Sequence, residues 1–179
     1  MSRYIFTSER LGFRAYTPDD IDPIAAINSD KSVMEFFEKP MTAEDTLDFI
    51  RRQEEQLRLN GYCFFVTELI ESQMVLGSIG LGYRDYPSPM RPFVDVGWRL
   101  KKSEWGKGYA TEGAKACLAF GFAMGIPEIF AITPVINKPS ERVMQKCGMQ
   151  PFGQFDYPFL PSDHRLNPHL IYHIQNPLL

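Results

Sequence analysis

A segment with two closely spaced glycines, Trp105–Thr111, is the part of the chain whose residue types point most directly to chemistry. An alternating stretch precedes it and an amphipathic helical pattern follows it, so Gly106 and Gly108 fall in a strand-to-helix turn. Glycines let successive backbone N–H groups converge on one point, because no Cβ stands in the way. The helix adds its unpaired first-turn N–H groups and the positive end of its dipole. Such a turn binds anions, most often phosphates, and it therefore predicts a phosphorylated cofactor.

Two better-known phosphate-binding motifs do not describe this turn. It lacks the Gly-Lys-Ser/Thr ending of a Walker motif, and it lacks the last glycine and the downstream acid of a dinucleotide fingerprint. The preceding strand, Lys107 between the glycines and the small Ala110 at the helix entry favour an anion site. A glycine pair that serves only to form a turn is the alternative.

The composition limits the class of protein. A chain of 179 residues, 44% hydrophobic and 13% aromatic, can bury a substantial core, and we expect a single domain over residues 1–179. The net charge of −3, with no block of Lys and Arg, argues against nucleic-acid binding. No apolar run reaches membrane-spanning length, so no membrane partner is expected. Three separated cysteines, Cys63, Cys117 and Cys147, are typical of reduced core thiols and predict a cytoplasmic location.

Hydrophobic periodicity predicts the elements that position the glycine turn. Seven segments have the pattern of strands: Phe6–Tyr16, Tyr62–Leu69, Val75–Tyr83, Phe93–Leu100, Ile129–Thr133, Gln150–Phe155 and His169–Ile174. Four have the pattern of helices: Pro18–Ser29, Thr42–Asn60, Tyr109–Met124 and Ser140–Lys146. Mixed strands and helices, with one strand–helix–strand crossover after the glycine turn, predict an α/β or α+β fold with one sheet and helices on its faces.

Several motifs together resemble one family. Trp105–Ala110 is similar to the Gln/Arg-x-x-Gly-x-Gly/Ala signature for acetyl-CoA in the GCN5-related N-acetyltransferases (GNAT). The Trp at the first position is familiar in the branch of ribosomal-protein N-terminal acetyltransferases, and Thr7–Leu11 looks like the opening strand of that branch. Asn137–Ser140, followed by Lys146–Met149, is similar to its Asn-x-x-Ser helix and to the Gly-Phe that ends it. The resemblance covers nearly the whole chain.

The resemblance implies a fold and a co-substrate. The sheet would be mixed, largely antiparallel and of six to seven strands, with helices on both faces, and it would splay between strands four and five, Phe93–Leu100 and Ile129–Thr133. Acetyl-CoA would lie in that opening, with its pantetheine arm along the Phe93–Leu100 strand and its pyrophosphate on the glycine turn; no metal is implied. The expected cofactor-binding residues are Val96, Gly97, Trp98, Trp105, Gly106, Lys107, Gly108, Tyr109, Ala110, Thr111 and Asn137. For Asn137, capping of the following helix is an alternative role.

Two residues are candidates for catalysis. Asp95 is the carboxylate nearest the expected thioester, and it is a candidate general base; pairing with Arg99 or Arg84 is its alternative role. Many family members carry a Tyr as general acid where this chain has Met144. Ser140 is the substitute that the resemblance implies, and helix capping is its alternative role.

The C-terminal histidines and three tyrosines are weaker candidates. His169 and His173 are four residues apart, but their segment has the pattern of a strand and lacks a third ligand, so zinc is not expected. His164 either lines an acceptor pocket or is a solvent-exposed histidine of its loop. Three tyrosines either wall the same pocket or pack at its rim: Tyr83, Tyr86 and Tyr157.

The sequence therefore predicts an acetyl-CoA-dependent N-acetyltransferase that acts by direct transfer, since no residue is marked as a nucleophile. The acceptor would be a primary amine, either a peptide N-terminus or a small molecule. Because the usual Tyr is absent, a non-catalytic acyl-CoA-binding or sensing protein on the same fold is one alternative. A nucleotide-binding protein that uses the glycine turn for ATP is another. By analogy with the branch, a homodimer is one option for its assembly.

Overall fold

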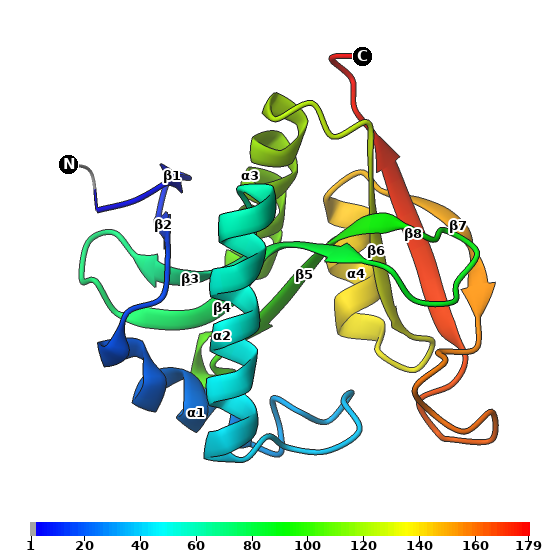
Figure 1. Cartoon of the computed structure of the whole chain (residues 1–179), viewed down its shortest axis with the longest axis horizontal. Coiled ribbons are helices and arrows are strands. Elements are labelled where there is room, and N and C mark those ends of the chain that lie inside the picture. Colours follow the sequence, from blue (N-terminus) through cyan, green and yellow to red (C-terminus); the bar gives the residue numbers. More distant parts are fainter. Residues whose placement is uncertain (1–2) are drawn as a thin grey trace.

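In the computed structural model, which describes residues 3–179, one eight-stranded sheet runs through the chain (Figure 1). Its strands are β1 (Phe6–Thr7), β2 (Leu11–Arg14), β3 (Phe64–Leu69), β4 (Val75–Arg84), β5 (Phe93–Leu100), β6 (Glu128–Pro134), β7 (Gln150–Phe155) and β8 (His169–Gln175). They lie in the order β1-β2-β3-β4-β5-β6-β8-β7, and all neighbours are antiparallel except β5 and β6. The predicted mixed, largely antiparallel sheet is confirmed.

The sheet has one strand more than the sequence predicts. The segment Phe6–Tyr16, expected as a single strand, folds back on itself, so that Phe6 of β1 lies opposite Phe13 of β2. The turn is closed by the Ser8 backbone N–H, which donates to the Leu11 carbonyl at 2.8 Å. The polar run Thr7–Arg10 interrupts the apolar pattern at this turn, and it is the sequence signal that marks the break.

Four helices flank the sheet (Figure 1). They are α1 (Ile21–Ser29), α2 (Ala43–Asn60), α3 (Tyr109–Ala123) and α4 (Lys138–Lys146), with single 3₁₀ turns at Pro18–Asp20 and Lys102–Glu104. The ends of α2 are as the sequence predicts: Thr42 accepts from the Asp45 N–H in a capping box, and Gly61 ends the helix with a φ of 77°. α4 begins two residues earlier than predicted, directly after Asn137.

The helices cover both faces of the sheet. On one face, Ile24 of α1 and Ile50 of α2 pack on Val66 of β3. On the other face, α3 buries Ala114 and Cys117 against the strands in the main core. None of the helices in the described part of the chain combines the length and the apolar character that a bilayer crossing needs.

A buried ion network ties the first strands to α1. Arg14 of β2 donates to both Asp20 oxygens at 2.7 and 2.8 Å, and its Nε donates to Glu68 of β3 at 2.9 Å. The Glu68 side chain is 0% exposed and also accepts from Arg3 and Tyr4. Burial alone would raise the pKa of Glu68, but these hydrogen bonds outweigh it and hold the pKa below its usual value.

We expect Glu68→Gln to lower the free energy of unfolding by about 3 kcal/mol at neutral pH, because it leaves Arg14 with half of its buried counter-charge. A lowered carboxylate pKa stabilises the fold above the unfolded-state pKa and loses this contribution as pH falls. The difference between wild type and variant should therefore shrink on acidification towards a pH of about 3. Urea unfolding at several pH values measures it.

Glu55→Gln is the matched control, since Glu55 forms an exposed pair with Arg58 on α2. It should leave the unfolding midpoint unchanged. Equal midpoints for wild type and Glu68→Gln would show that the network adds no stability.

Candidate active site

The central opening of the sheet lies between β5 and β6. β5 pairs with β4 over its whole length, but with β6 it shares a single pair, Asp95 opposite Phe130. Beyond Asp95 the two strands diverge, so the backbone of 96–98 has no strand partner on that side. The predicted splay between these strands is confirmed, and a cavity of about 1000 Å³ fills the opening.

The cavity gathers the residues that the sequence singled out. Its wall contains both catalytic candidates and all but one of the predicted cofactor-binding residues: Asp95, Val96, Gly97, Trp98, Trp105, Gly106, Gly108, Tyr109, Ala110, Thr111, Asn137 and Ser140. The exception is Lys107, whose ammonium pairs with Glu104 at 2.8 Å instead. Whatever Lys107 offers to a ligand therefore comes from its backbone.

The glycine turn has the conformation that the sequence requires. Gly106 and Gly108 have φ values of 80° and 84°, in the left-handed region that favours glycine. A Cβ at Gly106 would meet nothing within 4 Å, so the backbone angle and not packing demands glycine there. Within residues 3–179, no acceptor binds the backbone N–H groups of 106–111. These groups open into the cavity beside the positive end of α3, as an anion site needs.

An arginine from the far N-terminus holds this turn in place. The Arg10 Nη2 donates to the Lys107 carbonyl at 3.2 Å, and its guanidinium lies 4.5 Å from the Tyr109 ring centre. Arg10 also neutralises Glu112, the acid in the first turn of α3, through an ion pair of 2.6 Å. The carboxylate therefore does not cancel the positive end of the helix. Sequence reasoning missed Arg10, because nothing local links it to a turn about one hundred residues away.

Asp95 is buried in a pair with one of its two predicted partners. Its Oδ1 accepts from the Arg84 Nε at 3.0 Å, and Gly82 leaves the space that the pair occupies. Burial raises the pKa of Asp95, and the charge of Arg84 and its hydrogen bond oppose this only in part. Arg99 is not a partner, because it donates to Asn28 at 2.8 Å instead.

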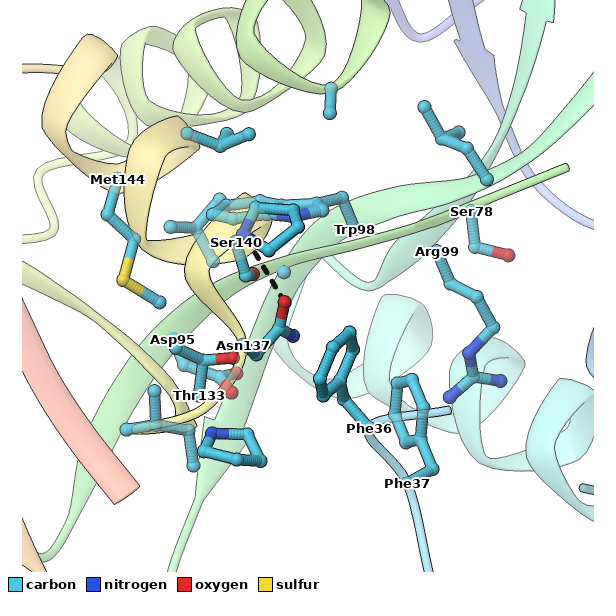
Figure 2. Close-up of a pocket in the computed structure, with 18 of the residues that line it drawn as sticks. Phe36, Phe37, Ser78, Asp95, Trp98, Arg99, Thr133, Asn137, Ser140 and Met144 are labelled. Carbon is cyan, nitrogen blue, oxygen red and sulfur yellow. Dashed lines mark hydrogen bonds between the residues drawn. The ribbon is translucent and has the colours of Figure 1, made fainter. Parts of the chain in front are cut away.

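Asn137 and Ser140 meet at the start of α4 (Figure 2). Asn137 is the N-cap residue, since its Oδ1 accepts from the Ser140 backbone N–H at 3.2 Å. The capping role given to Ser140 as an alternative is therefore wrong; Ser140 is the third residue of the helix, and its side chain is left to line the cavity. The cap uses only the Asn137 oxygen, so its amide NH₂ is available to a ligand. Met144 is buried at 1% exposure, and its thioether carries no proton.

Aromatic side chains wall the other end of the cavity. All three predicted tyrosines line it, and Tyr157 stacks on His169 with ring centres 4.7 Å apart. Burial lowers the pKa of His169 to about 4, so the ring is neutral, and its Nδ1 has no partner among the described residues. His164 does not line the cavity; its Nδ1 accepts from the Leu166 N–H.

The linker between α1 and α2 supplies Phe36 and Phe37 (Figure 2). Sequence reasoning gave this linker no role, since it has neither periodicity nor a motif.

Metal and thiol chemistry find little support in the described residues. No group of three or more His, Cys, Asp and Glu side chains within 3–179 could hold a metal ion. β8 is a strand, as predicted, and His173 pairs with Glu128 at 2.6 Å. All three cysteines are buried and free, and burial raises the pKa of Cys63 to about 12 and that of Cys147 to about 11. Thiols that stay protonated at neutral pH are poor nucleophiles.

Comparison with known proteins identifies the family to which the chain belongs. The sequence pattern of the Acetyltransferase (GNAT) domain matches residues 10–150. An uncharacterized N-acetyltransferase, YnaD of Bacillus subtilis (strain 168), is 31% identical over 151 residues, which are 83% of this chain and 84% of that protein. A GNAT-family acetyltransferase structure from Bacillus anthracis has a TM-score of 0.77 and 28% identity, covering 95% of this chain and 97% of that one.

Two further solved structures share the fold at lower identity. The ribosomal-protein-S5-alanine acetyltransferase of Vibrio fischeri has a TM-score of 0.75 and 18% identity, covering 96% of both chains. The spermidine N-acetyltransferase of Vibrio cholerae, solved with CoA and spermine, has a TM-score of 0.73 and 20% identity, covering 93% of this chain and 96% of that one. With the domain match over most of its length, the chain belongs to the GNAT family and is an acetyl-CoA-dependent acyltransferase.

Proposed function

We propose that this enzyme transfers the acetyl group of acetyl-CoA directly to a primary amine, either a peptide N-terminus or a small molecule. The observation that carries the proposal is the union, in one cavity, of two unpaired backbone surfaces: the N–H groups of the glycine turn and the open edge of β5. A phosphorylated ligand with an amide-containing arm supplies partners for both, an anion for the converging N–H groups and a strand-like backbone for the open edge.

The residues fit such a co-substrate at three places. The pyrophosphate would lie on the N–H groups of Gly106–Thr111, which Arg10 and Trp105 hold in place; the Trp105 indole N–H donates to the Leu100 carbonyl at 2.8 Å. The arm would pair with the backbone of 96–98, as a further strand does. The free NH₂ of Asn137 would donate to an arm carbonyl. Bound there, acetyl-CoA supplies an activated thioester.

The transfer needs one proton removed and one delivered. The amine nitrogen forms a bond to the acetyl carbon, the carbon–sulfur bond breaks, and the amine loses a proton. We assign the removal to Asp95, directly or through a water, since a buried carboxylate with a raised pKa is suited to general-base work. We assign delivery to the CoA sulfur to the Ser140 hydroxyl, which lines the cavity beside Asn137 and takes a replacement proton from solvent as it gives up its own.

Met144 is buried at the position where many members of the family carry a Tyr as general acid, and its thioether has no proton to give, so the proton for the CoA sulfur must come from another group. The enzyme would act in the cytoplasm, since three buried free thiols suit a reducing compartment.

An assay of thiol release from acetyl-CoA, with and without a panel of peptides, polyamines and other amines, tests the proposed acceptor class. Release that depends on an added amine, with the acetylated amine found by mass spectrometry, supports the proposal. CoA binding without turnover on any amine would contradict it. A melting temperature raised by ATP and not by CoA would contradict the proposed co-substrate.

We expect Gly106→Ala to lower CoA affinity at least tenfold, because a left-handed φ is unfavourable for alanine and the relaxed turn would misdirect its N–H groups. Gly125→Ala is the matched control: Gly125 has a φ of 83° and also nothing within 4 Å of a Cβ, but it lies at the other end of α3, outside the cavity. Both variants should lose similar stability, and calorimetric titration should find weaker CoA binding only for Gly106→Ala. Equal affinities would leave the turn without a role in binding.

Asp95→Asn should lower kcat by roughly 10²- to 10⁴-fold, the usual contribution of a general base, with CoA affinity retained. The control is Asp85→Asn, which removes a carboxylate from the same cavity wall, where it pairs with Arg91 at the surface. Steady-state kinetics and CoA titration measure both variants. Wild-type turnover in Asp95→Asn would restrict Asp95 to its pairing with Arg84.

Ser140→Ala should lower kcat and leave melting temperature and CoA affinity unchanged, because the Asn137 cap uses the Ser140 backbone and not its hydroxyl. Ser103→Ala, which removes an exposed hydroxyl bonded to Glu104, is its control. If Ser140→Ala turns over at the wild-type rate, the thiolate takes its proton from solvent.

A further inference from the structure

Arg99 is a cation of the cavity wall that no acid neutralises. Its guanidinium Nη1 donates to the Asn28 amide oxygen at 2.8 Å, and the Met41 sulfur lies 3.5 Å from the same nitrogen. Its Nε is buried and has no partner in residues 3–179, and no carboxylate of that range pairs with the side chain. Every contact of the charge within the described chain is thus to a neutral group.

The surroundings of Arg99 make a charge without a counter-charge energetically costly. The guanidinium lies 4.5 Å from the Phe37 ring centre and 5.4 Å from that of Phe49, so aromatic rings flank it, while the residue keeps intermediate exposure in the cavity wall. Burial lowers the pKa of Arg99 to about 10, which still leaves it charged at neutral pH. The nearby Tyr16 hydroxyl is no counter-ion, because burial raises its pKa and keeps it neutral. A buried charge without a counter-charge is rare unless a ligand supplies one.

The position of Arg99 relates it to the acceptor and not to the glycine turn. Asp95, Gly97 and Arg99 alternate along β5 and face the side covered by α1 and α2, whereas Val96 and Leu100 pack into the core beneath α3. In Figure 2 the rings of Phe36 and Phe37 lie between Asn137 and the Arg99 guanidinium. One face of the strand thus carries an acid at one end, an apolar middle and an unpaired cation at the other end.

We propose that Arg99 binds a carboxylate on the acceptor, which makes the preferred substrate a primary amine with an acidic group at a distance. This rests on the proposed acetylation of an amine near Asp95. Four residues along a strand span about 13 Å, so the two groups of a free α-amino acid, on one carbon, are too close. An extended peptide spans about 3.5 Å per residue. The side chains of Asp95 and Arg99 both extend from the strand towards the acceptor, so the peptide need not span the full distance between them. A carboxylate two or three residues from the acetylated α-amine fits.

The Nη1 nitrogen is used by Asn28 and the Nε is buried, so Nη2 is the nitrogen left for an incoming group. A charge-assisted hydrogen bond from a guanidinium to a carboxylate is among the strongest hydrogen bonds in proteins. The carboxylate can be the C-terminus of a short peptide or an acidic side chain near the N-terminus of a longer one.

The test compares matched peptides in two arms. One arm pairs the tripeptide Ala-Gly-Gly as free acid with its C-terminal amide. The other pairs an amidated pentapeptide carrying Glu at its third position with the same peptide carrying Gln. Wild type should prefer the acid by roughly 10- to 100-fold in kcat/KM in at least one arm, and the arm identifies the source of the carboxylate. Equal kcat/KM values for acid and neutral forms in both arms would overturn the proposal.

Arg99→Gln should abolish the preference for the acid, because the pair between the guanidinium and the carboxylate is lost. Arg52→Gln removes the same charge from an exposed position on α2 and should keep the preference. Melting temperature and CoA titration check the fold. Should Arg99→Gln not fold, Arg99→Lys, which keeps the charge without the fork, is expected to keep only part of the preference. A full preference in either Arg99 variant would contradict the assignment.

If no amine in either arm is acetylated, the proposed function fails, and binding still tests Arg99. The CoA-loaded protein should melt at a higher temperature with an acidic peptide than with its neutral counterpart. Equal melting temperatures would overturn the assignment of Arg99 as well.

Discussion

The site depends on one constraint: β5 hydrogen-bonds along its full length to β4 but meets β6 at a single residue pair. β5 and β6 are the two ends of a parallel crossover, and α3 must fit between them in sequence. The crossover starts with the glycine turn, so the open strand edge and the unpaired N–H groups of that turn arise at the same place. A closed sheet would satisfy its own backbone and leave nothing for a ligand to complete.

Charge is distributed around this opening in a consistent way. Two acids near the glycine turn, whose charge would weaken an anion site, are neutralised by ion pairs: Glu112 with Arg10, and Glu104 with Lys107. Asp95 shares its burial with Arg84, which keeps a carboxylate inside a largely aromatic wall. Arg99 alone among these charges has only neutral partners within the described chain, and this contrast separates it from the structural ion pairs. Pairing inside the protein and pairing left to a ligand are different uses of the same residue types.

The sequence predicts most of the fold and several of the segments that meet around the cavity, because these features rest on local signals. The glycine turn, the Thr42 cap and the Gly61 helix end are each encoded within a few residues. The strand break at Ser8 was missed because the polar run Thr7–Arg10 is short and was included in one strand with the apolar residues on both sides of it. The aromatic end of the cavity depends on side chains that converge from distant segments, such as Phe37 and His169, and no local sequence pattern connects them. For Asn137, both proposed roles, cofactor contact and helix cap, were predicted from its place in the sequence. Only the structure shows that its side-chain oxygen is used by the cap, where it accepts from the Ser140 N–H.

The contacts of Arg10 with the start of α3 join two segments that are far apart in the sequence. Arg10 lies in the N-terminal segment, and the glycine turn follows about one hundred residues later, so the contact closes a very long loop. Closing such a loop costs entropy, and topologies rich in such contacts fold slowly. The glycine turn is therefore not a self-sufficient unit of strand, turn and helix, and its geometry depends on the docking of the N-terminal hairpin.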